Sequence, residues 1–107
     1  MTELYTDKQI ANGRRKLYRA EQWRRDNPQA WGYLVSVARE RAARELPISG
    51  RGLIEAVRGK AFTDTKGRDT KTNNDYAAIV ARWVAMEHPE TAPYIEHRKT
   101  VFDLLVA

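Results

Sequence analysis

Helix-start and helix-stop signals divide this chain into short helical segments. Thr6 followed by Gln9 is a capping-box pattern, in which side chains satisfy free amides at the start of a helix. Pro28 suits the first position of a second helix, whereas Pro47 and Pro89 each end one. Between these points, apolar residues recur at the three- and four-residue spacing of a helix that buries one side. The chain is therefore predicted to fold as an all-α protein.

About five helices are predicted, in one compact domain that spans residues 1–107. Their expected bounds, in chain order, are 7–25, Asn27 and Pro28 to Pro47, about 50–60 after the cap Ser49, from Asn73 and Asn74 to near Glu87, and from the cap Thr91 onward through Phe102 and Val106. The segment 61–71 separates the third and fourth helices. Its threonines around Lys66-Gly67 suit either a small β-hairpin or a mobile loop. Because the stretch Thr63–Asn73 is polar and offers little to bury, it is expected to be the most mobile internal segment.

The apolar stripes of these helices predict the hydrophobic core. Its expected members are Leu34, Ala38, Leu53, Ile54, Val57, Ile79, Val80, Trp83, Ile95 and Phe102. Trp31 also falls on a stripe, whereas Trp23 lies beside one and is expected to be partly exposed. Arg98 falls in the middle of the apolar face of the fifth helix. A buried guanidinium there requires a carboxylate or carbonyl partner, and Glu55 is one candidate.

Composition excludes several classes of protein. The chain has no cysteine, which rules out disulfide scaffolds, thiolate metal sites and cysteine nucleophiles. His88 and His97 are nine residues apart, a spacing that matches no standard zinc motif. No nucleophile elbow or phosphate loop is present, so a non-enzymatic protein without cofactor or metal is expected. The start Met1–Leu4 lacks a signal-peptide pattern and no apolar run could cross a bilayer, so a cytoplasmic location is expected.

Positive charge is concentrated in the first part of the chain. The formal net charge is +5. Residues 1–59 contain 12 Lys and Arg against 7 Asp and Glu, whereas residues 60–107 contain 7 of each kind. Such an excess favours phosphate-bearing or acidic partners, although a purely solubilising role accounts for it equally well.

Ten residues are candidates for contacts with duplex DNA. The third helix follows the second after the short turn 46–49, as in a helix-turn-helix, although this is also a common way to pack two helices. Arginine offers a fork of donors that matches guanine or phosphate oxygens, so the third helix would read bases while the first helix and the hairpin would hold phosphates. The ten candidates are Arg14, Arg15, Lys16 and Arg19 of the first helix, Arg51, Glu55 and Arg58 of the third, and Lys66, Arg68 and Lys71 of the hairpin. Asn73 and Asn74 could read adenine, but asparagines just before a helix are more often caps.

One long stretch resembles a known group of proteins. Its residues are Ser49, Leu53-Ile54-Glu55 and Arg58, then Asn73-Asn74-Asp75-Tyr76, Ala81-Arg82-Trp83, Pro89 and Arg98. This run, over about residues 49–103, is similar to a pattern in small, mostly uncharacterised proteins of bacteriophage and prophage genomes. The resemblance assigns no role to any residue. It implies a phage-encoded factor that contacts DNA or a host protein.

Three hypotheses of function follow. The first is a small non-enzymatic DNA-binding protein of phage or mobile-element type, with a regulator as one such role. The second is a protein-interaction module that inhibits or adapts a host nucleic-acid-handling protein. The third is a structural or assembly protein of a virion. Their salt dependence separates the first from the others, because binding to nucleic acid releases many condensed counterions.

Overall fold

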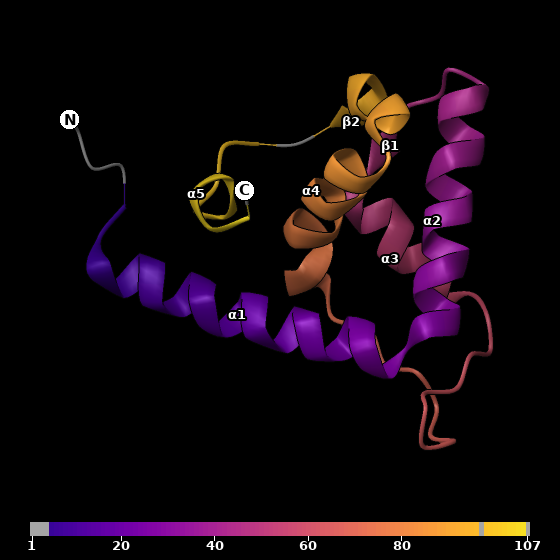
Figure 1. Cartoon of the computed structure of the whole chain (residues 1–107), viewed down its shortest axis with the longest axis horizontal. Helices are drawn as coiled ribbons and strands as arrows, with labels where there is room; N and C mark the ends of the chain where they lie inside the picture. Colours follow the sequence, from indigo (N-terminus) through magenta and orange to yellow (C-terminus); the bar gives the residue numbers. More distant parts are fainter. Residues whose placement is uncertain (1–4, 97, 107) are drawn as a thin grey trace.

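The two longest helices meet at a corner. In the computed structural model, which describes residues 5–96 and 98–106, Thr6 and Gln9 form the predicted capping box at the start of α1 (Asp7–Asp26). The chain then turns at Asn27 into α2 (Pro28–Ala43), with Pro28 at the first helical position. Figure 1 shows α1 running away from this corner along one side of the molecule, while α2 rises from it. The predominantly helical fold predicted from the sequence is confirmed.

The second helix ends earlier than its sequence pattern predicts. It stops at Ala43 instead of continuing to Pro47, because Glu45 adopts a left-handed backbone conformation with φ of 56°. The Leu46 amide then donates to the Arg41 carbonyl, and the Glu45 amide donates to the Ala42 carbonyl. These two bonds form the closing motif that satisfies free carbonyls at a helix C-terminus. The usual sequence signal for this motif is a glycine at the left-handed position, and glutamate does not provide it.

A two-stranded parallel sheet, absent from the sequence prediction, lies beside the helices. Strand β1 (Ile48–Ser49) pairs with β2 (Ile95–Glu96), so Ile48 lies opposite Ile95. Because β1 occupies part of the connection between α2 and α3, that connection spans residues 44–49 and is longer than the turn predicted. Helix α3 (Gly50–Arg58) starts as predicted, since the Ser49 hydroxyl accepts a hydrogen bond from the Gly52 amide.

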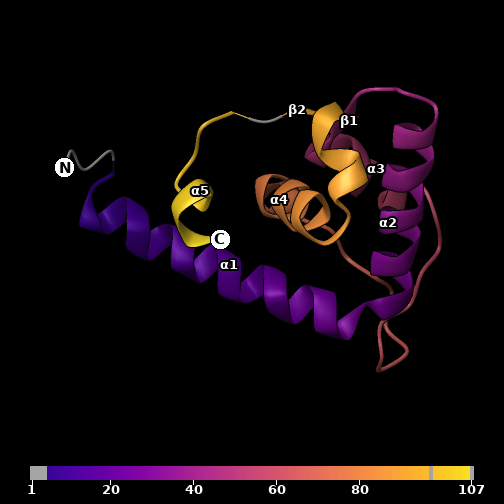
Figure 2. The same ribbon diagram turned by 45° about the horizontal axis from the view of Figure 1, so that its top comes forward.

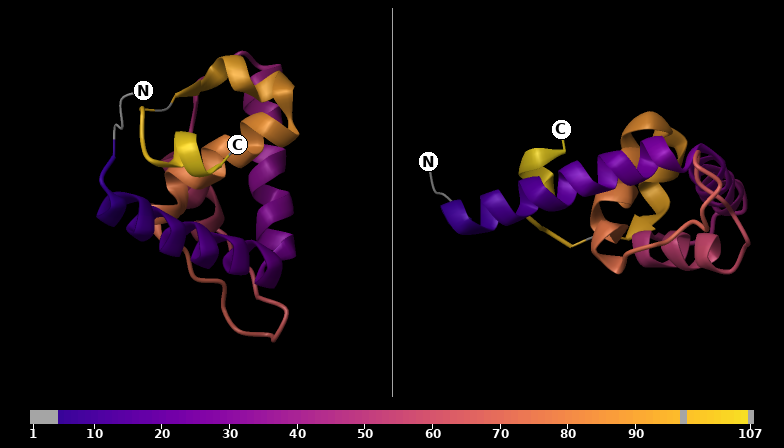
Figure 3. Two further views of the ribbon diagram at one scale, coloured as in Figure 1. Left: turned by 60° about the vertical axis from the view of Figure 1, so that its left-hand side comes forward. Right: turned by 90° about the horizontal axis from the view of Figure 1, so that it is seen from below.

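The segment between α3 and α4 folds back on itself. A single antiparallel bridge joins Thr63 to Asp69 within residues 61–71, here called the basic loop. The loop projects beyond the corner between α1 and α2, as Figure 3 shows. The chain then enters the 3₁₀ helix η1 (Asn74–Tyr76) and α4 (Ala77–Glu87). Asn73 caps η1 by accepting a hydrogen bond from the Asp75 amide, which confirms that asparagine as a cap.

The region predicted as a fifth helix after Thr91 is broken into three elements. These are the 3₁₀ helix η2 (Pro89–Tyr94), β2 and the four-residue α5 (Phe102–Leu105). Pro93 lies inside η2. Pairing of β2 with β1 then holds Ile95 and Glu96 in an extended conformation. Thr91 is not a cap, since it is fully buried and its hydroxyl donates to the His88 carbonyl. Figure 2 shows α5 lying over the N-terminal half of α1.

The core lies between α2, α3 and α4. Nine of the ten predicted core residues are buried, and Ile95 is partly buried. A glycine is required where α3 meets α4, because a Cβ at Gly50 would collide with the Ala77 carbonyl. On the other side of α4, a Cβ at Gly13 would approach Val101 and Leu105 within 2.9 Å, so the small residue lets α5 pack on α1.

The buried guanidinium belongs to Arg82 and not to Arg98. Arg82 is 7% exposed and donates to Asp103 and to the carbonyls of Ala78 and Arg98, each within 2.9 Å. Arg98 itself is exposed, and Glu55 pairs with another residue. The prediction of a buried Arg98 is therefore wrong, because the helix on which it depended does not form. Arg82 instead ties α5 to α4.

Replacing Ile54 by alanine should lower the free energy of unfolding by about 2–5 kcal/mol, because the residue is completely buried and alanine leaves a cavity. Met86→Ala is the matched control, since Met86 is 52% exposed and its replacement should cost only about 0.5 kcal/mol. Urea denaturation followed by circular dichroism measures both. Equal losses in the two variants would contradict the core described here.

Candidate nucleic-acid interface

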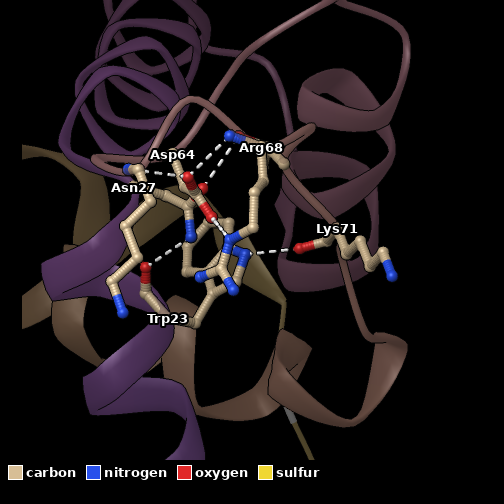
Figure 4. A network of polar contacts seen from close by, with 7 residues as sticks. Trp23, Asn27, Asp64, Arg68 and Lys71 are labelled. Atoms are coloured by element: carbon tan, nitrogen blue, oxygen red, sulfur yellow. Dashed lines mark hydrogen bonds and ion pairs between the residues drawn. The ribbon is translucent and has the colours of Figure 1, made fainter.

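Three hydrogen bonds hold the basic loop against the corner between α1 and α2. The Trp23 indole donates to the Lys71 carbonyl at 2.5 Å, and the Thr65 amide donates to the Asp26 carbonyl at 2.8 Å. The Thr70 hydroxyl donates to the Asn27 side chain at 2.7 Å. Figure 4 shows Trp23, Asn27 and Lys71 within this network. The antiparallel bridge between Thr63 and Asp69 fits the hairpin alternative left open by the sequence, while the expected mobility of the segment stays a prediction.

The loop is also organised from within by Asp64. Its carboxylate accepts hydrogen bonds from the amides of Lys66 and Arg68 at 2.8 and 2.9 Å, and from the Arg68 guanidinium at 2.9 Å. Gly67 completes the turn with φ of 77°, a conformation that suits glycine. The hydrogen bond from the Arg68 amide, supported by that from Lys66, holds the pKa of the Asp64 carboxyl below its ordinary value of 3.8.

An open groove of about 650 Å³ separates the basic loop from α1. It brings Arg19 of α1 together with Arg68 and Lys71 of the loop, so three of the ten predicted residues share one surface. The residues that line this α1–loop groove are Arg19, Gln22, Trp23, Asp26, Asn27, Asp64, Arg68, Asp69, Lys71 and Tyr76. Trp23 and Tyr76 form its aromatic part, with ring centroids 6.3 Å apart.

Trp23 is more enclosed than its sequence position predicts. It is only 8% exposed, whereas the apolar stripe of α1 leaves it to one side. The difference arises because the basic loop and η1 cover the indole. The Lys71 carbonyl of the loop accepts its N–H, and the Tyr76 ring of η1 packs against it. The expectation of partial exposure is therefore wrong, and Trp23 joins the loop to α1.

Of the other three predicted cations of α1, two face solvent and one is partly buried. Arg14 and Arg15 are exposed, and Lys16 is partly buried in a hollow beside α5. The Arg15 guanidinium donates to the Asn12 side chain on the same helix. None of these three forms an ion pair within residues 5–96 and 98–106. They remain available to an anionic partner.

Arg24, on the inner side of α1, is committed to the fold. Its guanidinium makes two hydrogen bonds to the Glu87 carboxylate, at 2.6 and 2.7 Å, and lies 4.1 Å from the centre of the Trp31 ring. The hydrogen bond from Arg24 lowers the pKa of Glu87. Arg24 therefore joins α1 to α4 and α2 and is not free for a ligand.

The predicted reading residues of α3 lie outside the α1–loop groove. Arg51 and Glu55 form an exposed ion pair at 3.4 Å, one helical turn apart. Arg58 donates to the side chains of Thr72 and Asn74, so it supports the chain leading into η1. Lys66 lies exposed at the loop tip. The structure thus separates the α3 candidates from those of α1 and the loop.

Sequence reasoning missed several residues of the groove. Asp64 had a signal, because aspartate before a glycine turn often accepts hydrogen bonds from nearby amides. Asn27 was given only as the expected start of the second helix, yet its side chain makes no cap hydrogen bond and instead donates to the Trp23 carbonyl. Asp26 and Asp69 carry no recognisable motif. Tyr76 was named within the stretch that resembles phage proteins, without any role in a site.

Two other site classes find no support in the part of the chain that the structure describes. It contains no group of three or more His, Asp or Glu side chains that could hold a metal ion. Among the same residues, no helix has the length and apolar character needed to span a membrane.

Comparison with known proteins yields no match to any family model, curated protein or solved structure at a significant level. The interpretation of the site therefore rests on its own geometry.

Asp64→Ala should speed amide hydrogen exchange at Lys66 and Arg68, because both amides lose their acceptor. Asp69→Ala is the control, since it removes an exposed carboxylate from the same loop whose side chain makes no hydrogen bond to any residue that the structure describes. Exchange monitored by NMR distinguishes the two variants. Unchanged exchange in Asp64→Ala would mean that the carboxylate does not organise the loop.

Acid should release the same turn. The pKa of Asp64 in the folded protein is lowered. Its contribution to the stability of the turn is therefore complete above the ordinary pKa and is lost as pH falls through the lower folded value. The amide signals of Lys66 and Arg68 should therefore stay constant from about pH 6 down to about pH 4, then move toward unfolded positions below the ordinary value. An NMR titration measures this. Movement centred above pH 3.8 would contradict the lowered pKa.

Proposed function

We propose that this protein binds nucleic acid through the exposed cationic side of α1 and the adjoining basic loop. The observation that carries the proposal is the charge of α1, which contains seven basic and three acidic residues and so accounts for +4 of the total +5. Within the described residues, Arg24 is its one cation in an ion pair with a carboxylate. Unpaired surface cations gain most from contact with phosphates.

The spacing of these cations supports the proposal. A helix of 20 residues is about 30 Å long, enough to lie along several consecutive phosphates. Arg15 and Arg19 are four residues apart and therefore lie on the same side of α1. Arg19 also lines the groove opposite Arg68 and Lys71, so the cationic track continues from the helix onto the loop. Hydrogen bonds already order the loop, which reduces the entropy lost on binding.

Discrimination between sequences would have to come from another surface. Arg51, Glu55 and Arg58 remain the candidates on α3, but all three have intramolecular partners. The exposed pair of Arg51 and Glu55 would open at little cost, since such pairs contribute about 0–1 kcal/mol. Phosphate contacts by α1 and the loop are therefore the primary basis of the proposed binding, in keeping with the phage-type DNA-binding hypothesis.

A second candidate function is docking on a host nucleic-acid-handling protein. It is favoured by Tyr18, which is 58% exposed on the same cationic helix. Tyrosine and arginine are both enriched in protein interfaces. A protein partner would not release the condensed counterions of a nucleic acid, so the salt dependence of binding separates the two candidates.

The double variant Arg15→Gln/Arg19→Gln should weaken duplex binding and flatten its salt dependence. Each lost phosphate contact reduces the slope of log K against log salt by about 0.9, so a reduction of about 1.8 is expected. Glutamine retains good helix propensity, which protects α1. Fluorescence anisotropy across a salt series measures the slope.

Arg39→Gln/Arg44→Gln is the matched control, because it removes the same charge from two exposed positions, one on α2 and one directly after it, that have ion-pair partners. Its slope should remain that of the wild type. If both double variants lowered the slope of log K against log salt equally, the effect would come from net charge and not from the position of the arginines on α1. Absence of duplex binding at low salt would reject the proposal and promote the protein partner.

A further inference from the structure

The α1–loop groove carries as many carboxylates as cations. Arg19, Arg68 and Lys71 face a lining that also contains Asp26, Asp64 and Asp69. A groove built for phosphates alone would not place three carboxylates beside them, because like charges repel. The mixture fits a ligand that presents both anionic groups and hydrogen-bond donors.

The acidic side chains of the groove differ in availability. Asp64 is committed to the loop, where it accepts from two amides and one guanidinium. Asp26 and Asp69 have no side-chain hydrogen bond within the described residues, and Asp69 is exposed. Gln22 donates to Tyr18 through its nitrogen, which leaves its carbonyl oxygen as a further acceptor. The groove therefore presents free acceptors as well as cations.

Aromatic rings supply the third property of the groove. Trp23 is nearly buried and donates its N–H to the Lys71 carbonyl, so its ring is held in a fixed position. Tyr76 is partly exposed, tilted by 50° against Trp23, and its hydroxyl bonds to none of the described residues. A partly exposed ring on a fixed support is a platform on which a flat ligand can stack.

A nucleotide combines all the groups that this lining selects. Its phosphate suits Arg19 and Lys71, its ring suits Tyr76, and its exocyclic amine suits a carboxylate. The groove volume of about 650 Å³ lies within the usual range of small-ligand sites, which is about 300–1,000 Å³. Bases inside a duplex are stacked and paired, so a base can enter only from a single strand or after unstacking.

We infer that the α1–loop groove holds one unstacked base of a single-stranded nucleic acid, stacked on Tyr76, with neighbouring phosphates on Arg19 and Lys71. The inference rests on the proposed function and narrows its ligand from nucleic acid in general to strands with an accessible base. Asp26 and Asp69 accept from the amino group of that base. Arg15, one helical turn before Arg19, extends the phosphate contacts along α1.

The test compares three probes: a short deoxycytidine strand, the same strand with abasic sugars, and a duplex. The wild type should bind the base-bearing strand roughly 5- to 150-fold more tightly than the abasic strand, the effect of stacking one base. Tyr76→Leu should remove most of that difference and leave binding to the abasic strand and duplex unchanged. Tyr76→Phe retains the ring and should retain the difference.

Asp69→Ala supplies a second measurement that does not disturb the aromatic packing, because Asp69 is exposed. It should narrow the difference between the base-bearing and abasic strands. Equal binding of these two strands by the wild type would overturn the inference that the groove holds a base, while leaving the proposed phosphate binding intact. Absence of binding to all three probes would overturn the proposed function itself, and the base site with it.

Discussion

The buried side chain of Asn27 joins the three segments that form the corner of the molecule. It is 5% exposed, donates to the Trp23 carbonyl at the end of α1, and accepts from the Thr70 hydroxyl of the basic loop. A buried amide left without partners costs about 1–3 kcal/mol, so each partner helps to fix the other. The direction of α1 relative to α2, the position of the loop and the shape of the α1–loop groove all depend on this junction. The side-chain amide of Asn27 thus helps to set both the corner between the two helices and the shape of the groove.

Helix starts were predictable because capping is a local interaction. The bonds at Thr6 and Ser49 join residues three positions apart, so their signals are complete within a few letters of sequence. Pairing of β1 with β2 was not predictable, because Ile48 and Ile95 are distant in sequence and each strand contains only two residues. The early end of α2 was equally hidden, since Glu45 takes a conformation for which glycine is the usual signal.

The candidate site was predictable in its cations and not in its arrangement. Basic residues on α1 and the loop are visible as letters, but only the fold brings Arg19 to Arg68 across a groove and leaves Arg51 elsewhere. The acidic and aromatic parts of the lining were missed because each has an ordinary structural explanation in the sequence. Tyr76 belongs to an apolar stripe, and Asp26 lies at the end of a helix. Their combination becomes informative only when they share one surface.

The charge of α1 also gives the molecule an electrical orientation. This helix carries nearly all of the net charge and lies along one side, while the remainder of the chain is close to neutral. The charge distribution is therefore strongly dipolar. Near a polyanion, such a dipole experiences a torque that turns α1 toward the negative surface before contact. Encounters then begin in a restricted set of orientations, and less of the rotational search remains to be done after collision.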